Sequence, residues 1–348
     1  MTIGDREKST RRIRGPEKAA VLGAGSWGTA LALHLARSGD PVVLWARSQG
    51  TVLALRERGE NTVYLGGHRF PRNLEVTGRL GHALDDARLV LFVVPAQHSR
   101  PVFREAASHL SPSADLVIAS KGIEEESLLR LSEVLAREAG EVAGRRATVL
   151  SGPSFAAEVA RGDPTAVVVA GEDGRAAARV QERLSRDNLR VYSSRDRAGV
   201  ELAGAFKNVV AIATGIAEGI GFGTNTRAAL ITRGMVEMAR LGSRMGGRPE
   251  TFAGLAGAGD LILTCTGALS RNRTVGLEVG RGRELQSVLS GMRMVAEGVA
   301  TTRAVVALAE THGVELPIAG QVSAVLFGGT PPADAVATLL ARPLKEEA

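Results

Sequence analysis

The amino-acid sequence predicts two domains, an α/β domain with a parallel sheet followed by an all-helical domain. The 348 residues exceed the usual size of a single domain. Short continuous apolar runs, typical of strands covered on both faces, recur between residues 18 and 196. From Ala198 onward, long helical patterns replace them. We therefore expect a loose basic tail over 1–17, a strand-rich domain over 18–196 and a helical domain over 197–348.

The composition favours a globular protein of a reducing compartment. Hydrophobic residues make up 44% of the chain but aromatic residues only 3%, so the cores must be aliphatic. The only cysteine, Cys265, excludes an intrachain disulfide, and the N-terminus has no apolar signal core; both observations favour the cytoplasm. The longest clear apolar run, Leu89 to Ala96, is too short to span a bilayer, which takes roughly 18 residues.

Charge and histidine content argue against two other classes of protein. The net charge is +6, but arginine is spread along the whole chain and forms no basic face with interleaved aromatic residues, so we expect no nucleic-acid partner. The six histidines and the single cysteine show no metal-ligand spacing, so we expect no metal.

The first predicted strand leads into a glycine-rich turn. The stretch KAAVLGAGSWG, Lys18 to Gly28, is a short apolar run that continues through Gly23 and Gly25. This G-x-G-x-x-G spacing between a strand and a helix suits a dinucleotide pyrophosphate, because the glycines allow a tight turn, close approach of the phosphates and close packing of helix on strand. A tight turn without a nucleotide is the alternative. A second buried strand is expected over 41–46.

The residue after that second strand bears on the choice of cofactor. Arg47 stands about twenty residues beyond the glycines, where an NAD site usually carries an acid. An arginine there suits the 2′-phosphate of NADP, so NADP is favoured over NAD; a surface arginine is the alternative. We expect a helix over 48–58 and a loop over 61–71.

Polar residues follow two of the later strands. We expect strands over 89–94, 116–119, 148–150, 165–170 and 189–192. Ligands of open parallel sheets gather at the carboxyl ends of the strands, and Lys121 stands at such an end, so a functional lysine is favoured over a solvated one. Gly152 begins a turn after another strand, and we expect Ser154 to cap a helix that reaches Val159. This terminus suits a phosphate, with a plain cap as the alternative.

Polar residues also interrupt the apolar patterns of the helical domain. Lys207 and Asn208 lie in the middle of a helix predicted over 198–219. A lysine is costly to bury there without a partner, so we expect Lys207 to face a cleft. Asp260 stands in a glycine-rich turn, where a helix cap is the plain alternative.

Two more polar stretches occur in the same domain. The run from Ser270 to Arg273 precedes a helix expected over 274–280, and Glu297 follows an apolar residue. A solvated loop and a helix-start acid are the plain alternatives. Lysine, aspartate, arginine and asparagine in one small domain favour a common site.

Taken in order, these motifs resemble one family. The stretches GAGSWGTALA, ASKGIE, SGPSFAAEV, GAFKNVVAI, GIGFGTNTRAALITRG, GLAGAGDLILTCTG, SRNR and VVALAETHGVELPI are similar to those of bacterial-type NAD(P)-dependent glycerol-3-phosphate dehydrogenases. The resemblance covers roughly residues 18 to 345. Many dehydrogenases share the glycine triplet, whereas TNTRAALITRG and LTCTGALSRNR are specific. The N-terminal tail and the spacing around 61–72 depart from the family pattern.

The resemblance implies a fold, a reaction and a set of site residues. The fold is a Rossmann dinucleotide-binding domain followed by an all-helical domain of the 6-phosphogluconate dehydrogenase type. The reaction is reversible hydride transfer between NAD(P)H and dihydroxyacetone phosphate, giving sn-glycerol 3-phosphate for phospholipid synthesis. By fold analogy alone, a homodimer is expected. The resemblance implies Lys207 as proton acceptor or donor, with Lys121 and Asp260 as the other catalytic residues.

It also implies two sets of binding residues. Those for the substrate are Lys121, Gly152, Ser154, Lys207, Asp260, Ser270, Arg271 and Asn272. Those for the cofactor are Gly23, Gly25, Ser26, Trp27, Gly28, Arg47, Tyr64, Lys121, Ala156, Arg271, Val295 and Glu297. Tyr64 is the weaker candidate because it lies in a variable loop.

The chemistry needs a group that can both give and take a proton. A ketone that accepts hydride at carbon needs a proton at oxygen, and the reverse reaction needs a base. Lys207 can serve if its pKa falls from about 10.4 toward 7 or 8, which burial and a positive neighbour such as Lys121 promote, while Asp260 would limit the fall. Arg271 can bind the phosphate with its planar fork, and Asn272 and a helix N-terminus at Thr274 can add donors.

Two other functions stay open from the sequence. One is a related two-domain dehydrogenase that acts on a hydroxy acid or a sugar acid. The other is a non-catalytic NADP-sensing protein with the basic tail as its contact arm; the presence of both Lys121 and Lys207 at the motif positions argues against it.

Overall fold

The first half of the chain forms one twisted sheet covered by helices on both faces. The computed structural model describes residues 16–344 and 346, so most of the predicted basic tail lies outside the described residues. The strand order is β10-β9-β8-β7-β6-β1-β2-β5, and neighbours are parallel except β8 and β9. The strands are β1 (Ala19–Leu22), β2 (Val42–Trp45), β5 (Leu74–Thr77), β6 (Leu89–Phe92), β7 (Asp115–Ile118), β8 (Thr148–Ser151), β9 (Thr165–Ala170) and β10 (Leu189–Ser194).

Alternate residues of β1 enter two separate cores, one on each face of the sheet. Ala19 and Val21 pack with helices α1 and α8, and Ala20 and Leu22 pack with helices α3 to α5. Burial on both faces explains why the strand reads as a continuous apolar run. The helices of this half are α1 (Ser26–Arg37), α2 (Gln49–Arg58), α3 (Leu80–Leu84), α4 (Ser99–Ala107), α5 (Leu131–Ala139), α6 (Glu141–Arg146), α7 (Ala156–Arg161) and α8 (Gly174–Leu184).

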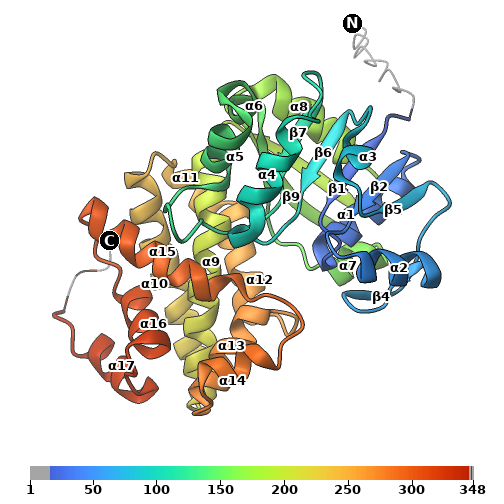
Figure 1. Ribbon diagram of the computed structural model, residues 1–348. Helices are drawn as coiled ribbons and strands as arrows, with labels where there is room; N and C mark the ends of the chain where they lie inside the picture. The colour runs from blue at the N-terminus through green and yellow to red at the C-terminus, as the bar shows by residue number, and fades with distance from the viewer. Residues whose placement is uncertain (1–15, 345, 347–348) are drawn as a thin grey trace, which may run out of the picture.

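In the second half, helices joined by loops are the regular structure of the described residues, and they pack around α9 (Figure 1). Helix α9 is long and apolar enough to cross a membrane, which the sequence analysis did not anticipate, but its apolar window is 100% buried inside the protein, as in the core helix of a domain. The helices are α9 (Arg197–Gly219), α10 (Thr224–Arg244), α11 (Pro249–Ala253), α12 (Asp260–Thr266), α13 (Arg271–Gly280), α14 (Leu285–Ser290), α15 (Glu297–His312), α16 (Pro317–Phe327) and α17 (Pro332–Leu340).

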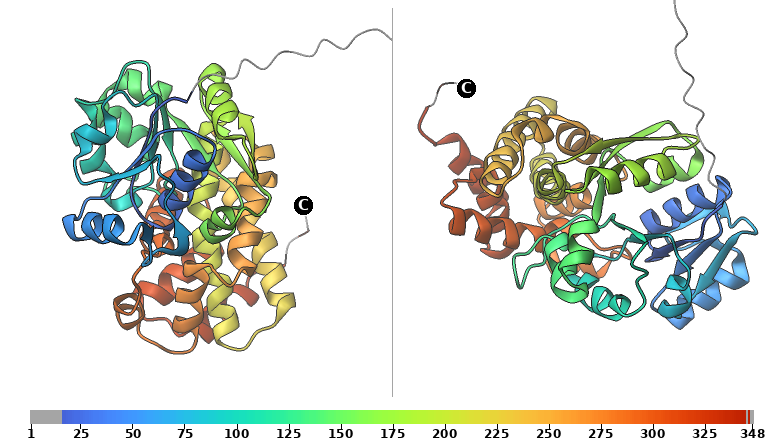
Figure 2. Two further views of the ribbon diagram at one scale, coloured as in Figure 1. Left: turned by 90° about the vertical axis from the view of Figure 1, so that its right-hand side faces the viewer. Right: turned by 90° about the horizontal axis from the view of Figure 1, so that it is seen from above.

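Helices α9 and α13 touch through glycine. A Cβ on Gly276 would lie 2.1 Å from the carbonyl oxygen of Ile212, and one on Gly215 would lie 2.1 Å from that of Arg273. Larger side chains would force the two backbones apart. The view from above in Figure 2 (right) shows the sheet and the helical half side by side, with the C-terminal helices on the side away from the N-terminal strands.

The prediction of a loop over 61–71 is wrong. An antiparallel pair, β3 (Glu60–Asn61) and β4 (Leu65–Arg69), occupies much of this stretch. Buried Asn61 anchors it, since its side-chain amide donates to the Ala24 carbonyl at 2.9 Å and to the Thr29 hydroxyl at 2.8 Å. Sequence patterning missed the pair because its short strands carry glycine and polar residues in place of an apolar run.

Candidate active site

Three charged side chains from three separate elements meet where the two halves of the chain join. Lys121 follows the carboxyl end of β7, Lys207 lies in the middle of α9, and Asp260 begins α12. The Asp260 carboxylate binds Lys207 Nζ at 2.8 Å through Oδ1 and Lys121 Nζ at 2.6 Å through Oδ2. The Asp260 side chain is 2% exposed, against 8% for Lys207 and 17% for Lys121, so the carboxylate forms the floor of the site.

Burial and neighbouring charges set the protonation of this group. Burial lowers the pKa of Lys207 to about 8; Asp260 opposes this change, and the positive charge of Lys121 adds to it. Burial alone would raise the pKa of Asp260, but the two ammonium groups outweigh it and hold that pKa below its usual value. Lys207 therefore changes protonation near neutral pH, while Asp260 stays ionised.

Thr264 completes the surroundings of Lys207, and the sequence analysis missed it. Its hydroxyl accepts from Lys207 Nζ at 2.8 Å and donates to the Asp260 carbonyl at 2.6 Å. Thr264 stands four residues after Asp260, so the two side chains share one face of α12. That spacing was the signal available in the sequence.

The glycine-rich turn has the geometry of a nucleotide-binding turn. Gly23 has φ +122°, and a Cβ there would lie 2.5 Å from the Val93 carbonyl oxygen. A Cβ on Gly28 would lie 1.9 Å from the Gly23 carbonyl oxygen, whereas one on Gly25 meets nothing within 4 Å. Two of the glycines therefore permit close packing, and the third leaves open space beside the backbone. The turn lies where the strand order reverses, between β1 and β6, the usual place for a dinucleotide.

Two buried polar atoms lack a partner in this region. They are the indole nitrogen of Trp27, in the first turn of α1, and Oε2 of Glu297, in the first turn of α15. Oε1 of Glu297 accepts from the Ala96 backbone N–H at 3.1 Å, and burial raises the pKa of Glu297 to about 7. Unsatisfied buried groups are costly, so a donor and an acceptor left in this state fit a polar ligand such as a dinucleotide.

The other predicted cofactor residues lie on separate elements. The Ser26 hydroxyl donates to the Tyr64 carbonyl at 2.7 Å and lies 3.2 Å from the sulfur of Met294, which joins the turn to the segment before α15. Arg47 follows β2 and is exposed. Val295 is 48% exposed. Ala156 begins α7, which packs on α1.

The structure corrects two predicted helix starts. Helix α13 begins at Arg271 and not at Thr274, because the Ser270 hydroxyl accepts from the Arg273 N–H at 3.3 Å and caps the helix. Arg271 and Asn272 therefore stand in the first helical turn. Helix α7 begins after Phe155, and Ser154 does not cap it; the Ser154 hydroxyl instead donates to the Gly152 carbonyl at 3.0 Å.

Backbone and amide groups connect the remaining predicted residues. The Gly152 carbonyl accepts from Lys121 Nζ at 3.2 Å, and its φ of +138° suits glycine. The Asn272 amide donates to Asn208 Oδ1 at 2.8 Å and accepts from the Gly298 N–H at 2.9 Å. Arg271 is exposed at the start of α13, yet desolvation by the surrounding protein still lowers the pKa of its guanidinium, and the charge of Glu297 opposes that change.

Two other features lie outside this arrangement. The residues that the structure describes contain no group of three histidine, cysteine, aspartate or glutamate side chains that could hold a metal ion.

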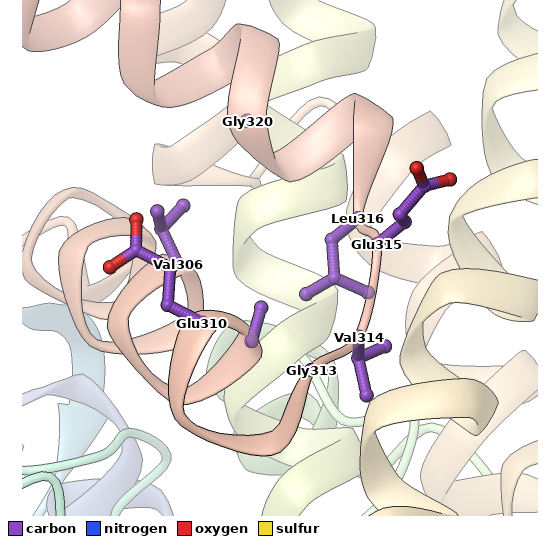
Figure 3. Close-up of a pocket in the computed structure, with 8 residues that line it drawn as sticks. Val306, Glu310, Gly313, Val314, Glu315, Leu316 and Gly320 are labelled. Atoms are coloured by element: carbon purple, nitrogen blue, oxygen red, sulfur yellow. The ribbon is translucent and has the colours of Figure 1, made fainter.

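A cavity of about 280 Å³ lies between the end of α15 and the start of α16, lined by residues from Val306 to Gly320 (Figure 3). It is at the opposite end of α15 from Glu297, roughly 20 Å along the helix axis.

Family models and curated relatives match almost the whole chain. The model of the N-terminus of NAD-dependent glycerol-3-phosphate dehydrogenase matches residues 18–177, and that of its C-terminus matches residues 196–337. The glycerol-3-phosphate dehydrogenase (NAD(P)+) of Syntrophotalea carbinolica is 51% identical over 94% of this chain and 98% of its own. The enzyme of the same name from Koribacter versatilis is 48% identical over 95% of this chain and 98% of its own. The chain belongs to the glycerol-3-phosphate dehydrogenase family.

Solved structures agree with this membership of the glycerol-3-phosphate dehydrogenase family. The glycerol-3-phosphate dehydrogenase of Coxiella burnetii is 41% identical, with a TM-score of 0.90, and the match covers 94% of this chain and 99% of that one. A D-mandelate dehydrogenase is 14% identical with a TM-score of 0.59, over 90% of this chain and 98% of its own, and shares the fold alone. The predicted order of a Rossmann domain followed by a helical domain is confirmed.

Proposed function

We propose that the protein catalyses the reversible reduction of dihydroxyacetone phosphate to sn-glycerol 3-phosphate with NAD(P)H. The observation that carries this proposal is the buried amine of Lys207, held by Asp260 and Thr264 in a chain of the glycerol-3-phosphate dehydrogenase family. Family membership supplies the reaction, and the buried lysine supplies the proton donor that the reaction requires.

Lys207 gives a proton to the ketone oxygen during reduction and takes it back during oxidation. Its lowered pKa of about 8 suits both directions near neutral pH. Asp260 keeps the ammonium in place without removing its proton, because two lysines share one carboxylate. Lys121 keeps the pKa of Lys207 low through its charge and places a second ammonium beside the developing oxyanion.

The phosphate of the substrate lies at the start of α13 in this proposal. Arg271 offers a planar guanidinium, and Asn272 keeps one amide hydrogen free while Asn208 and Gly298 fix its orientation. Gly152, Ser154 and Ser270 complete the substrate surroundings. A partly buried site strengthens each of these charge-assisted contacts.

The glycine-rich turn would hold the cofactor in this proposal, and a bound NAD(P)H or NAD(P)+ would supply or accept the hydride. The residues that would hold it are Gly23, Gly25, Ser26, Trp27, Gly28, Arg47, Tyr64, Lys121, Ala156, Arg271, Val295 and Glu297. Trp27 and Glu297 each bring a buried polar atom without a partner. Exposed Arg47 after β2 favours NADP over NAD, because a guanidinium suits a 2′-phosphate.

The wider biological setting is also part of the proposal. We place the protein in the cytoplasm, as a homodimer that supplies sn-glycerol 3-phosphate to phospholipid synthesis. We also place the boundary between the domains at residues 196 and 197, where α9 begins behind its cap Asp196.

One assay tests this function. Consumption of NADPH is followed on addition of dihydroxyacetone phosphate and repeated with NADH. A set of hydroxy acids and sugar acids is tested in parallel as substrates for oxidation by NADP+ and NAD+. We expect turnover with the phosphate ester, faster with NADPH, and none with the acids. Turnover of an acid alone would establish a related dehydrogenase, and no turnover with any substrate would favour a nucleotide-sensing role.

A further inference from the structure

Glu218 joins three helices of the catalytic half at a distance from the reacting groups. Its Oε2 accepts from Arg227 Nη2 of α10 at 3.2 Å and lies 3.5 Å from Arg273 Nε of α13. Glu218 itself belongs to the last turn of α9. The three side chains are between 14% and 28% exposed, so solvent screens this cluster only in part.

Arg273 stands in the first turn of α13, directly after Arg271 and Asn272. The glycine contacts of α9 with α13 fix the distance between these helices, and Val275 and Val279 of α13 are buried in the core that α9 also lines. Polar contacts add to this packing at the first turn of α13. They are the hydrogen bonds of Asn272 with Asn208 and Gly298 and the ion pair of Glu218 with Arg273.

We infer that Glu218 is a positioning residue for the phosphate end of the substrate site. It holds Arg273, and through it the first turn of α13, so that Arg271 and Asn272 face the position of the phosphate before the substrate arrives. Arg227 contributes by fixing the Glu218 carboxylate from the side of α10. This inference rests on the proposed function, since it assigns a phosphate to that turn. Glu218 itself touches no reacting atom.

The chain offers a matched control for this cluster. Glu278 of α13 binds Arg281 and Arg283 at 2.9 Å each, so like Glu218 it is one carboxylate shared by two arginines. Its partners stand just after the end of α13, away from Arg271. Replacing either glutamate by glutamine removes the same charge and keeps the size.

The test compares the variants Glu218→Gln, Glu218→Asp and Glu278→Gln with the unaltered protein. For Glu218→Gln we expect the KM for dihydroxyacetone phosphate to rise about tenfold, with kcat reduced less than about threefold and the KM for NADPH unchanged. The pH midpoint of the rate should stay where it is, because Lys207 is not affected. Glu218→Asp should restore part of the loss, and Glu278→Gln should match the unaltered protein.

Hydrogen exchange gives a readout that does not depend on activity. In the protein without ligand, peptides that cover residues 271–277 should exchange faster in Glu218→Gln and at the normal rate in Glu278→Gln. If Glu218→Gln exchanges faster but the unaltered protein does not reduce dihydroxyacetone phosphate, the role of Glu218 in positioning α13 is supported. In that case only the proposed function is refuted. If Glu218→Gln matches Glu278→Gln in both KM and exchange, or loses only thermal stability, the inference is wrong.

Discussion

At the scale of single residues, the structure makes Lys207 the centre of the proposed proton transfer. Burial lowers the pKa of its amine, and Asp260 and Thr264 fix its position. Both neighbours belong to α12 of the same helical half, whereas Lys121 follows strand β7 of the sheet. The contact of Lys121 with Asp260 therefore depends on the correct assembly of the two halves.

Removal of the Lys207 amine tests this role directly. Lys207→Met should lower kcat by at least about 100-fold, because it removes the proposed proton donor to the ketone oxygen. Binding of NADPH, followed by its fluorescence, should persist. Replacement of exposed Arg244 by glutamine, at the end of α10, serves as a control for the loss of one positive charge. A nearly normal rate in Lys207→Met would remove it from the mechanism.

The pKa of Lys207 also predicts opposite pH profiles for the two directions. Reduction needs the protonated amine, so its kcat/KM should fall as the pH rises through about 8. Oxidation needs the neutral amine, so its kcat/KM should rise over the same interval. Steady-state rates in both directions between pH 6 and about 10 measure this. Profiles that move in the same direction would contradict the assignment.

Replacement of Arg271 should weaken substrate binding more than it slows proton transfer. Arg271→Ala removes the guanidinium at the start of α13, so we expect its main effect to be a rise in the KM for dihydroxyacetone phosphate, by about tenfold or more. Initial rates at saturating NADPH measure it. An unchanged KM would count against a phosphate contact.

At the scale of elements, Glu237 of α10 links the stability of the protein to pH. Its buried carboxylate accepts from the backbone N–H groups of Ile318 at 2.7 Å and Ala319 at 3.2 Å, at the start of α16. Burial raises its pKa to about 7, although these donors and the charges of Arg240 and Arg342 oppose the change. The folded protein therefore holds a proton at pH 5 to 7 that the unfolded chain has lost.

This difference predicts a loss of stability with rising pH. The free energy of unfolding should fall between pH 5 and 7 by up to about 3 kcal/mol from this group and then level off. Glu237→Gln cannot titrate and should lack this component. Denaturant titrations of both proteins at several pH values measure the difference. Parallel pH curves for the two proteins would refute the linkage.

Buried elements were easier to predict from the sequence than elements that depend on polar side chains. Strands β1, β2, β6 and β8 and helix α9 were predictable because they are buried and read as apolar runs or as a helical pattern with few interruptions. Strand β5 was not predicted, since exposed Glu75 interrupts its apolar run. The start of α13 was misplaced because Ser270 caps it through its side chain, and the run after Ser270 is polar enough to read as a loop. The β3–β4 pair depends on Asn61, whose two bonds join distant parts of the chain.

At the scale of the whole molecule, the site depends on contacts that no sequence pattern encodes. Lys121 and Asp260 are separated by 139 positions in the chain, yet they form an ion pair. The resemblance to a known family named both residues, but only the fold shows that the one carboxylate of Asp260 binds two lysines. The halves are also joined by Glu297 to the Ala96 N–H and by Arg303 to Glu125 at 3.0 Å.

Burial of α9 has a consequence for inactivation by heat. The helix that carries Lys207 is enclosed along its apolar length, so its displacement requires disruption of the surrounding core. Catalytic failure on warming should then coincide with cooperative melting and not precede it. Residual rate and near-ultraviolet circular dichroism, recorded on the same heated samples, should decline together. A stabilising substitution remote from the site would shift both curves by the same number of degrees.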